Sequence, residues 1–202
     1  MIIYILCMFT YSNCIKAEPL PIENDTIDVN ILKRNAIKDI DLDKLKIIKD
    51  TLWITSTSDF LYFPFGLFKS ISEFKKRFKL AWKQNIEEDR SDEIPRYNYK
   101  VYKMIFKNSF VKLFKDDEKN EVEIVSGKII NPELLLTNQI KIGIDKKVFL
   151  LKFFNKTPET ILDKINVVKL ESGLLGMWHY YKFKDNILQE IIFKTDYLFN
   201  QN

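Results

Sequence analysis

The single histidine of the chain, His179, is the first residue to consider for chemistry because imidazole titrates near neutral pH. One histidine cannot supply a histidine-based metal cluster, and it leaves a Ser-His-Asp triad without a spare base. His179 stands in a segment whose residues alternate like those of a β-strand. We therefore expect a hydrogen-bonded histidine inside a sheet. A pocket that combines His179 with a nearby acid is the alternative.

Acidic residues gather at positions 87–93 and 116–118, where carboxylates could bind a cation. The first group lacks the alternating ligands and central glycine of a calcium loop, so we expect a solvated loop there and a hairpin tip at the second. The sequence also lacks the phosphate loops G-x-x-x-x-G-K-S/T and G-x-G-x-x-G and the nucleophile motif G-x-S-x-G. It predicts no catalytic residue, no metal site and no cofactor, and thus a protein that is not an enzyme.

The segment M-W-H-Y-Y-K-F, residues 177–183, offers a binding site instead. Alternate residues of a strand point to opposite faces, so Trp178, Tyr180 and Lys182 share one side. The lysine in this row indicates the side that helices leave uncovered. Trp and Tyr make good anchors for a protein partner because they bury a large area at little entropic cost. We predict that these three residues bind a partner. The alternative is that both aromatic residues pack in the core.

Composition limits the class of partner. The chain has 32 basic and 28 acidic residues and a formal net charge of +4, so its charge is mixed. This balance argues against a dedicated nucleic-acid-binding protein, which would have a basic stripe. With 46% hydrophobic residues, the 202-residue chain can fold as one domain or two small ones. We expect a protein partner and no nucleic acid.

The N-terminus indicates export. Residues 1–13 are almost wholly apolar, which suits a signal peptide and is short for a membrane span. Cleavage after Ala17 would release a free protein. Alternatively Y-S-N-C resembles a lipoprotein cleavage motif, with Tyr and Asn in place of the usual Leu and small residue, and Cys14 would then carry a lipid. A buried N-terminal strand or helix is the third possibility. We assign residues 1–17 to the leader, and we expect a protein in the cell envelope or secreted, touching the membrane only through a lipid anchor.

Cysteine usage agrees with this assignment. Both cysteines, Cys7 and Cys14, lie in the leader. A mature exported chain would therefore have no intramolecular disulfide and no thiol nucleophile.

The predicted elements after the leader fall into two similar units. A tether and an unassigned segment occupy residues 18–50, the first unit residues 51–136 and the second residues 137–202. Each unit has a glycine between apolar residues, then F-x-x-x-F, then three strands. In the first unit we expect an edge strand from residue 51, a helix over 70–84, and strands over 98–106, 109–115 and 121–125. In the second we expect helices over 146–154 and from Thr157 and Pro158, and strands over 165–170, 176–183 and 188–194.

Two such units bury more apolar surface than one, because a single helix on a three-stranded meander has a thin core. We predict an α+β fold in which the two helix-plus-meander units share an antiparallel sheet with helices on one face. Chance similarity in a sequence rich in Phe, Lys and Ile is the alternative.

The segments I-K-I-G-I-D-K-K-V-F-L-L-K-F (residues 140–153) and W-H-Y-Y-K-F-K-D-N-I-L-Q-E-I-I-F (residues 178–193) resemble the small envelope domains related to BamE and to the β-lactamase inhibitor protein. The resemblance covers residues 63–197 in two copies. Only the second copy shows two short helices before its strands. The resemblance implies an exported, non-enzymatic role in protein binding or assembly, and it supplies no catalytic residues.

Our leading expectation is an exported protein that binds another envelope or extracellular protein through an open aromatic sheet face. Two alternatives remain. One is a small-ligand carrier or enzyme with a cone-shaped α+β pocket that uses His179, and the other is a structural surface lipoprotein.

Overall fold

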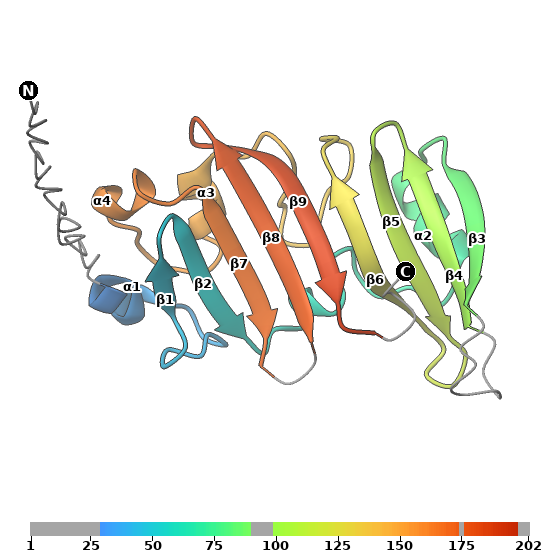
Figure 1. The fold of residues 1–202 in the computed structure, drawn as a ribbon, viewed down its shortest axis with the longest axis horizontal. Helices are drawn as coiled ribbons and strands as arrows, with labels where there is room; N and C mark the ends of the chain where they lie inside the picture. Colours follow the sequence, from blue (N-terminus) through green and yellow to red (C-terminus); the bar gives the residue numbers. More distant parts are fainter. Residues whose placement is uncertain (1–28, 90–98, 174–175, 198–202) are drawn as a thin grey trace, which may run out of the picture.

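A computed structural model of the chain describes residues 29–89, 99–173 and 176–197. Within these residues nine strands form one sheet in the order β1-β2-β7-β8-β9-β6-β5-β4-β3. Neighbouring strands are antiparallel except β2 and β7, which are parallel. Figure 1 shows the strands in a single layer with α2 and α3 behind it. The fold is therefore α+β with one large, mostly antiparallel sheet, as expected.

The elements are short. The strands are β1 (Lys46–Ile48), β2 (Thr51–Ser56), β3 (Lys83–Asp89), β4 (Tyr99–Phe106), β5 (Ser109–Asp116), β6 (Glu121–Ile129), β7 (Val167–Ser172), β8 (Met177–Lys184) and β9 (Ile187–Thr195). The α-helices are α1 (Val29–Asn35), α2 (Ile71–Phe78), α3 (Lys146–Leu150) and α4 (Glu159–Leu162), and Asp59–Leu61 forms the 3-10 helix η1.

The order of the strands differs from the order of the chain at two places. The meanders β4-β5-β6 and β7-β8-β9 join through their last strands, with Lys128 of β6 paired to Ile192 of β9. At the other place β2 inserts between β1 and β7. The prediction of an edge strand from residue 51 is wrong, because β1 covers the outer side of β2. Strand β2 lies in the range assigned to the first unit, residues 51–136. It nevertheless pairs with β7, which lies in the range assigned to the second unit.

Helix α2 begins as predicted and ends early. The Ser70 hydroxyl accepts a hydrogen bond from the Glu73 amide at 3.2 Å, which caps the first turn. Lys79 adopts a left-handed conformation with φ of 50°, and this ends the helix. The predicted helix over residues 70–84 is therefore too long. A loop was expected from residue 87 onward, but β3 extends to Asp89.

Aromatic side chains pack together beside α2 although the helix ends early. Trp82 lies beyond the helix, but its ring centroid is 5.4 Å from that of Phe74. Phe74 is buried and also packs on Phe78. The three rings contact one another although only two of them are helical.

Helix α3 is also shorter than predicted. Asp145 caps α3 by accepting from the Lys147 amide at 2.8 Å. Helix α3 ends at Leu150, so the prediction of residues 146–154 is too long. The helix expected from Thr157 and Pro158 is α4, which begins at Glu159 with Pro158 at the N-cap position and no side-chain cap.

A buried lysine joins α3 to the end of α4. The Lys146 ammonium donates to the carbonyl oxygens of Leu162 at 2.5 Å and Ile165 at 2.6 Å. Burial lowers the pKa of Lys146. The carbonyls at the end of α4 thus receive hydrogen bonds that the helix itself cannot supply.

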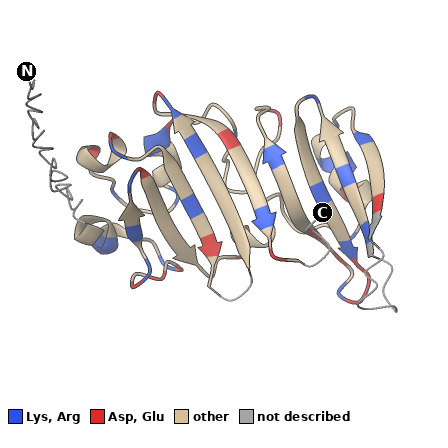
Figure 2. Cartoon of the chain, viewed as in Figure 1, with Lys and Arg blue, Asp and Glu red and all other residues tan. Residues whose placement is uncertain are grey.

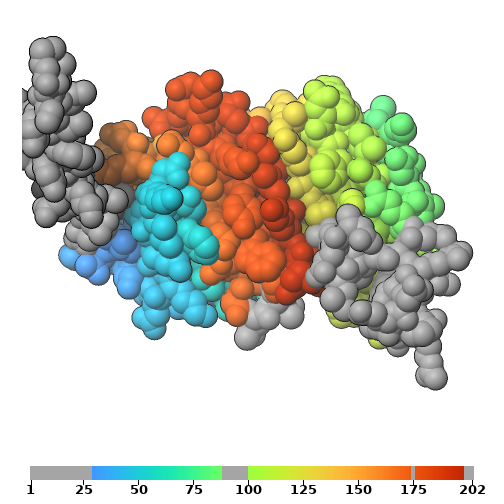
Figure 3. All heavy atoms as spheres, viewed as in Figure 1, coloured from blue at the N-terminus to red at the C-terminus, as the bar shows by residue number. Residues whose placement is uncertain are grey.

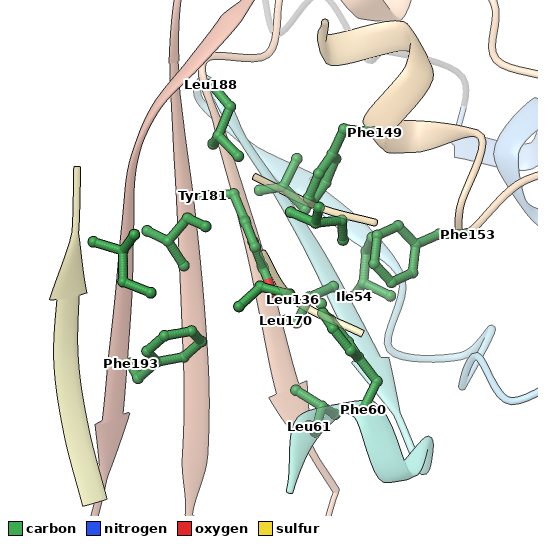
Figure 4. Packing of buried hydrophobic residues seen from close by; sticks show 14 of the residues in the cluster. Ile54, Phe60, Leu61, Leu136, Phe149, Phe153, Leu170, Tyr181, Leu188 and Phe193 are labelled. Atoms are coloured by element: carbon green, nitrogen blue, oxygen red, sulfur yellow. The ribbon is translucent and has the colours of Figure 1, made fainter. Parts of the chain in front are cut away.

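The core lies between the sheet and the helices. In β8 the buried residues alternate with partly or fully exposed ones, and the buried set is Met177, His179, Tyr181 and Phe183. Phe149 of α3 packs on Tyr181 with ring centroids 4.7 Å apart. Figure 4 shows Phe149, Phe153 and Phe60 directed toward Tyr181. We call the other side of the same strand the open face, and no helix of the described residues lies over it.

Candidate protein-binding face

One residue from each of the nine strands lies in a continuous row across the open face. Residues that are directly paired on neighbouring strands point to the same side of a sheet, so the registers of all eight strand pairs define this row. We call it the central row. From β1 to β3 it contains Lys46, Trp53, Lys169, Tyr180, Ile192, Lys128, Phe110, Ile105 and Lys83.

The central row combines cations with apolar side chains and includes no acidic residue. Figure 2 shows basic residues, all of them lysines, spread along the strands of the sheet. The space-filling view in Figure 3 shows β2, β7 and β8 directly, with no helix in front of them. Strands β2, β7 and β8 are thus part of the molecular surface on this side.

Lys169 lies among the aromatic residues of the row. Its ammonium is 3.5 Å from the centre of the Trp53 ring and 5.9 Å from the centres of Trp178 and Tyr180. The Lys46 ammonium lies 4.7 Å from the Trp53 ring. Lys169 is only 6% exposed, so its contacts with the rings are largely shielded from water. The lysine, on β7, therefore orders three aromatic residues from the two neighbouring strands β2 and β8.

Glu171 holds Lys169 in place. Its carboxylate accepts a hydrogen bond from the Lys169 ammonium at 2.9 Å and another from the Thr55 hydroxyl at 3.0 Å. Burial acts to raise the pKa of Glu171, but the hydrogen bonds from Lys169 and Thr55 outweigh it and the pKa is lowered. The carboxylate is thus charged at neutral pH and neutralises the lysine beside it.

The structure places the residues predicted to bind a partner on the open face. Trp178 and Tyr180 are half-buried, and Lys182 is exposed. The Lys182 ammonium lies 3.6 Å from the Glu190 carboxylate. Burial raises the pKa of Tyr180. Trp178 and Tyr180 meet Lys169, while Lys182 lies further along β8. Their role in binding remains a prediction.

Sequence reasoning missed Trp53 and Lys169. They meet only because β2 and β7 pair, and nothing in the local sequence predicts that pairing. One signal was present, since Lys169 interrupts an apolar run and Trp53 alternates with the buried Leu52 and Ile54.

His179 lies on the opposite side, in the core. It is 1% exposed, and its ring contacts Phe193 at 4.6 Å and Phe60 at 5.9 Å between centroids. Its Nδ1 lies 3.2 Å from the Tyr181 hydroxyl. Burial lowers the pKa of His179 to about 3. The imidazole is therefore neutral at physiological pH and enclosed by aromatic rings, which counts against a role in acid–base catalysis.

A shallow groove lies on the open face where β6 meets β9. Its volume is about 470 Å³, and Phe110, Ser126, Lys128, Ile192 and Lys194 are among the residues that line it. The backbone ladder between the two strands has three registered pairs. The groove offers two ammonium groups, a hydroxyl and apolar surface at the middle of the central row.

Two further features are the predicted lipid attachment site and the side chains that could ligate a metal ion. Cys14, the predicted lipid attachment site, lies outside the described residues. Within residues 29–89, 99–173 and 176–197, no group of three or more His, Cys, Asp or Glu residues could hold a metal ion. In the same part of the chain, no helix is long and apolar enough to cross a membrane.

Comparisons of the chain with protein-family models, with curated proteins and with solved structures found no match. The resemblance to BamE-like domains therefore stays an expectation.

Proposed function

We propose that the protein is non-enzymatic and binds another protein through its open face. The observation that carries this proposal is the arrangement of Trp53, Trp178 and Tyr180 around Lys169 on an uncovered side of the sheet. Aromatic side chains that are already ordered lose little entropy on binding, so they make effective anchors. The central row extends this surface across the whole sheet.

We also propose that the sheet consists of two related units of the kind found in BamE-like domains. Gly66 and Gly143 both have positive φ, 100° and 90°, and each precedes a capped helix. Two residues after Gly66, the Phe68 carbonyl accepts a hydrogen bond from the second residue of β6 at 2.9 Å. One residue after Gly143, the Ile144 carbonyl accepts one from the second residue of β9, also at 2.9 Å. In both proposed units, the segment that follows the glycine is thus hydrogen-bonded to the start of the last strand of the meander.

Export remains part of the proposal. The apolar residues 1–13 and the polar, proline-containing stretch after them favour a leader and a tether. An exported chain would meet its partner in the cell envelope or outside the cell. Acylation of Cys14 would hold the open face near a membrane without inserting the fold into it.

The two alternatives make different demands on the structure. A carrier or enzyme built around His179 needs an accessible imidazole, and the enclosed, neutral His179 weighs against it. A purely structural lipoprotein needs no specific surface, so it does not account for the ordered aromatic residues of the open face.

Photo-cross-linking tests the binding proposal. A photoreactive phenylalanine derivative would replace Tyr180 on the open face and, as the control, exposed Lys76 on α2, which covers the other side of the sheet. Both variants would be expressed in the native host and irradiated. We expect one specific protein to be cross-linked from position 180, not from position 76, and to be lost when Trp178→Ala is added. No cross-linked protein, or the same products from both positions, contradicts the proposal.

Intact-mass analysis of the mature protein tests export. A mass that matches acylated Cys14, or a chain that begins at Glu18, supports it. An unmodified chain that retains Met1 contradicts it.

A further inference from the structure

Acidic residues beside the central row balance the charge of its lysines only in part. Four of its nine members are lysines and none is acidic. The Glu190 carboxylate beside the row is shared between two lysines. It lies 3.4 Å from the Lys128 ammonium and 3.6 Å from the Lys182 ammonium. One negative charge between two positive charges leaves a local positive excess. The middle of the open face therefore attracts carboxylate or phosphate groups.

The groove at β6 and β9 concentrates this excess beside apolar surface. Lys194 lies 5.8 Å from the Tyr180 ring and makes no ion pair within the described part of the chain. Lys128 and Lys194 are diagonal neighbours across the two strands, since Lys128 pairs with Ile192 and Lys194 stands two residues further along β9. Such positions are about 7–8 Å apart in an antiparallel pair. Ile192 and Phe110 supply the apolar part of the same groove.

We propose that the partner presents an acidic polypeptide segment with apolar or aromatic side chains among its carboxylates, and that this segment lies in the groove. This inference rests on the proposed function. Lys128 and Lys194 bind two carboxylates at positions i and i+2 of the segment, and an apolar side chain that points to the same side of the segment packs on Ile192 and Phe110. In an extended chain, residues i and i+2 lie about 7 Å apart, which matches the spacing of the two lysines.

A nucleic acid is a less suitable ligand for Lys128 and Lys194 than an acidic polypeptide. Single-stranded nucleic acid binds to sheets by stacking its bases on free aromatic faces. Here the Lys169 ammonium covers the Trp53 ring, and the ammonium groups of Lys169 and Lys194 both lie within 6 Å of the Tyr180 ring. The carboxylates of Glu171 and Glu190 on the same side would repel phosphates. The surface therefore favours spaced carboxylates over a continuous polyanion.

Binding of defined polymers tests the inference. Purified protein would be titrated with a labelled random copolymer of glutamate and tyrosine, with polyglutamate, and with a 20-nucleotide oligothymidylate. We expect the copolymer to bind most tightly and its affinity to fall as salt rises, because exposed ion pairs are screened. Tighter binding of the oligonucleotide, or no binding of the copolymer at low salt, overturns the inference.

A matched pair of double variants locates the site. Lys128→Ala with Lys194→Ala removes two charges from the groove, and Lys76→Ala with Lys152→Ala removes two exposed charges away from it. We expect the first pair to weaken copolymer binding at least tenfold and the second less than twofold. Equal weakening by both pairs would show that net charge alone drives binding. Thermal unfolding of all variants checks that they fold, which we expect because each of the four lysines is exposed.

The outcomes separate this inference from the proposed function. A partner cross-linked at position 180 together with failure of the copolymer to bind would refute the acidic segment and leave the binding face intact. Binding of the copolymer without any cross-linked partner would refute the proposed function and leave the chemistry of the groove established.

Discussion

The Lys169 ammonium lies 3.5 Å from the centre of the Trp53 ring, and these two residues are direct partners in the parallel pair of β2 and β7. The contact joins the second strand of the chain to the seventh. It also places a positive charge on the aromatic surface that we propose as the binding site. Because Glu171 neutralises Lys169 from the side, the lysine orders the rings without adding a free charge.

Replacing Lys169 tests whether it orders this surface. Lys169→Ala leaves the Glu171 carboxylate without its cation and exposes the face of Trp53, so we expect a loss of about 1–2 kcal/mol of unfolding free energy. The measurement is urea denaturation followed by tryptophan fluorescence. Lys182→Ala is the control, since Glu190 keeps Lys128 as a partner, and we expect a change within about 0.5 kcal/mol. Equal effects of the two changes would mean that Lys169 has no special structural role.

Two adjacent tyrosines separate the binding face from the core. Tyr181→Ala removes a fully buried ring that packs on Phe149, so we expect a loss of about 3–5 kcal/mol. Tyr180→Ala, alone or with Trp178→Ala, removes side chains from the open face, and we expect stability to fall by no more than about 1 kcal/mol per residue. Partner binding should be lost in the second case. A large fall in melting temperature on Tyr180→Ala would instead assign that residue a core role.

The buried imidazole predicts how stability depends on pH. His179 has a pKa of about 3 in the folded protein, below the value of about 6.5 expected when the chain is unfolded. As pH falls below 6.5 the unfolded chain takes up a proton that the folded chain cannot, so stability is lost toward acid. We expect His179 to account for about 1.5 kcal/mol of the loss between pH 6.5 and pH 5. Denaturation of the wild type and of His179→Phe across this range measures it, and parallel pH profiles would contradict the prediction.

The glycine that precedes α3 is required for its backbone conformation. Gly143 has φ of 90°, and a Cβ added there would meet no atom within 4 Å. Gly143→Ala should therefore destabilise the fold by about 1–2 kcal/mol through backbone strain alone. In Gly173→Ala the new Cβ makes ordinary contact with Thr55 at 3.7 Å, and we expect little change. Thermal unfolding compares the two. A neutral Gly143→Ala would remove one of the arguments for two related units.

The hairpins and the start of α2 could be predicted from sequence because their signals are local. Alternation and turn residues located β5 and β8 to within a residue or two, and Ser70 marked the start of α2. The end of α2 could not be predicted in the same way. Lys79 adopts the left-handed conformation although it is not glycine, and the aromatic contacts of Trp82 are satisfied equally well from an extended segment. Hydrophobic periodicity alone therefore extended the helix into β3.

The residues of the open face, too, could be predicted from sequence only in part. The sequence by itself determined that Trp178 and Tyr180 lie on one side of β8 and His179 and Tyr181 on the other, because the period of a strand is a local property. Only the tertiary structure decided that β2 lies beside β7 and β6 beside β9, and so which residues form the central row and the groove. Strand order and register depend on backbone hydrogen bonds between segments far apart in the chain and on which faces can be buried together. Lys169 could be read as an isolated polar residue in an apolar strand until those neighbours placed three aromatic rings around it.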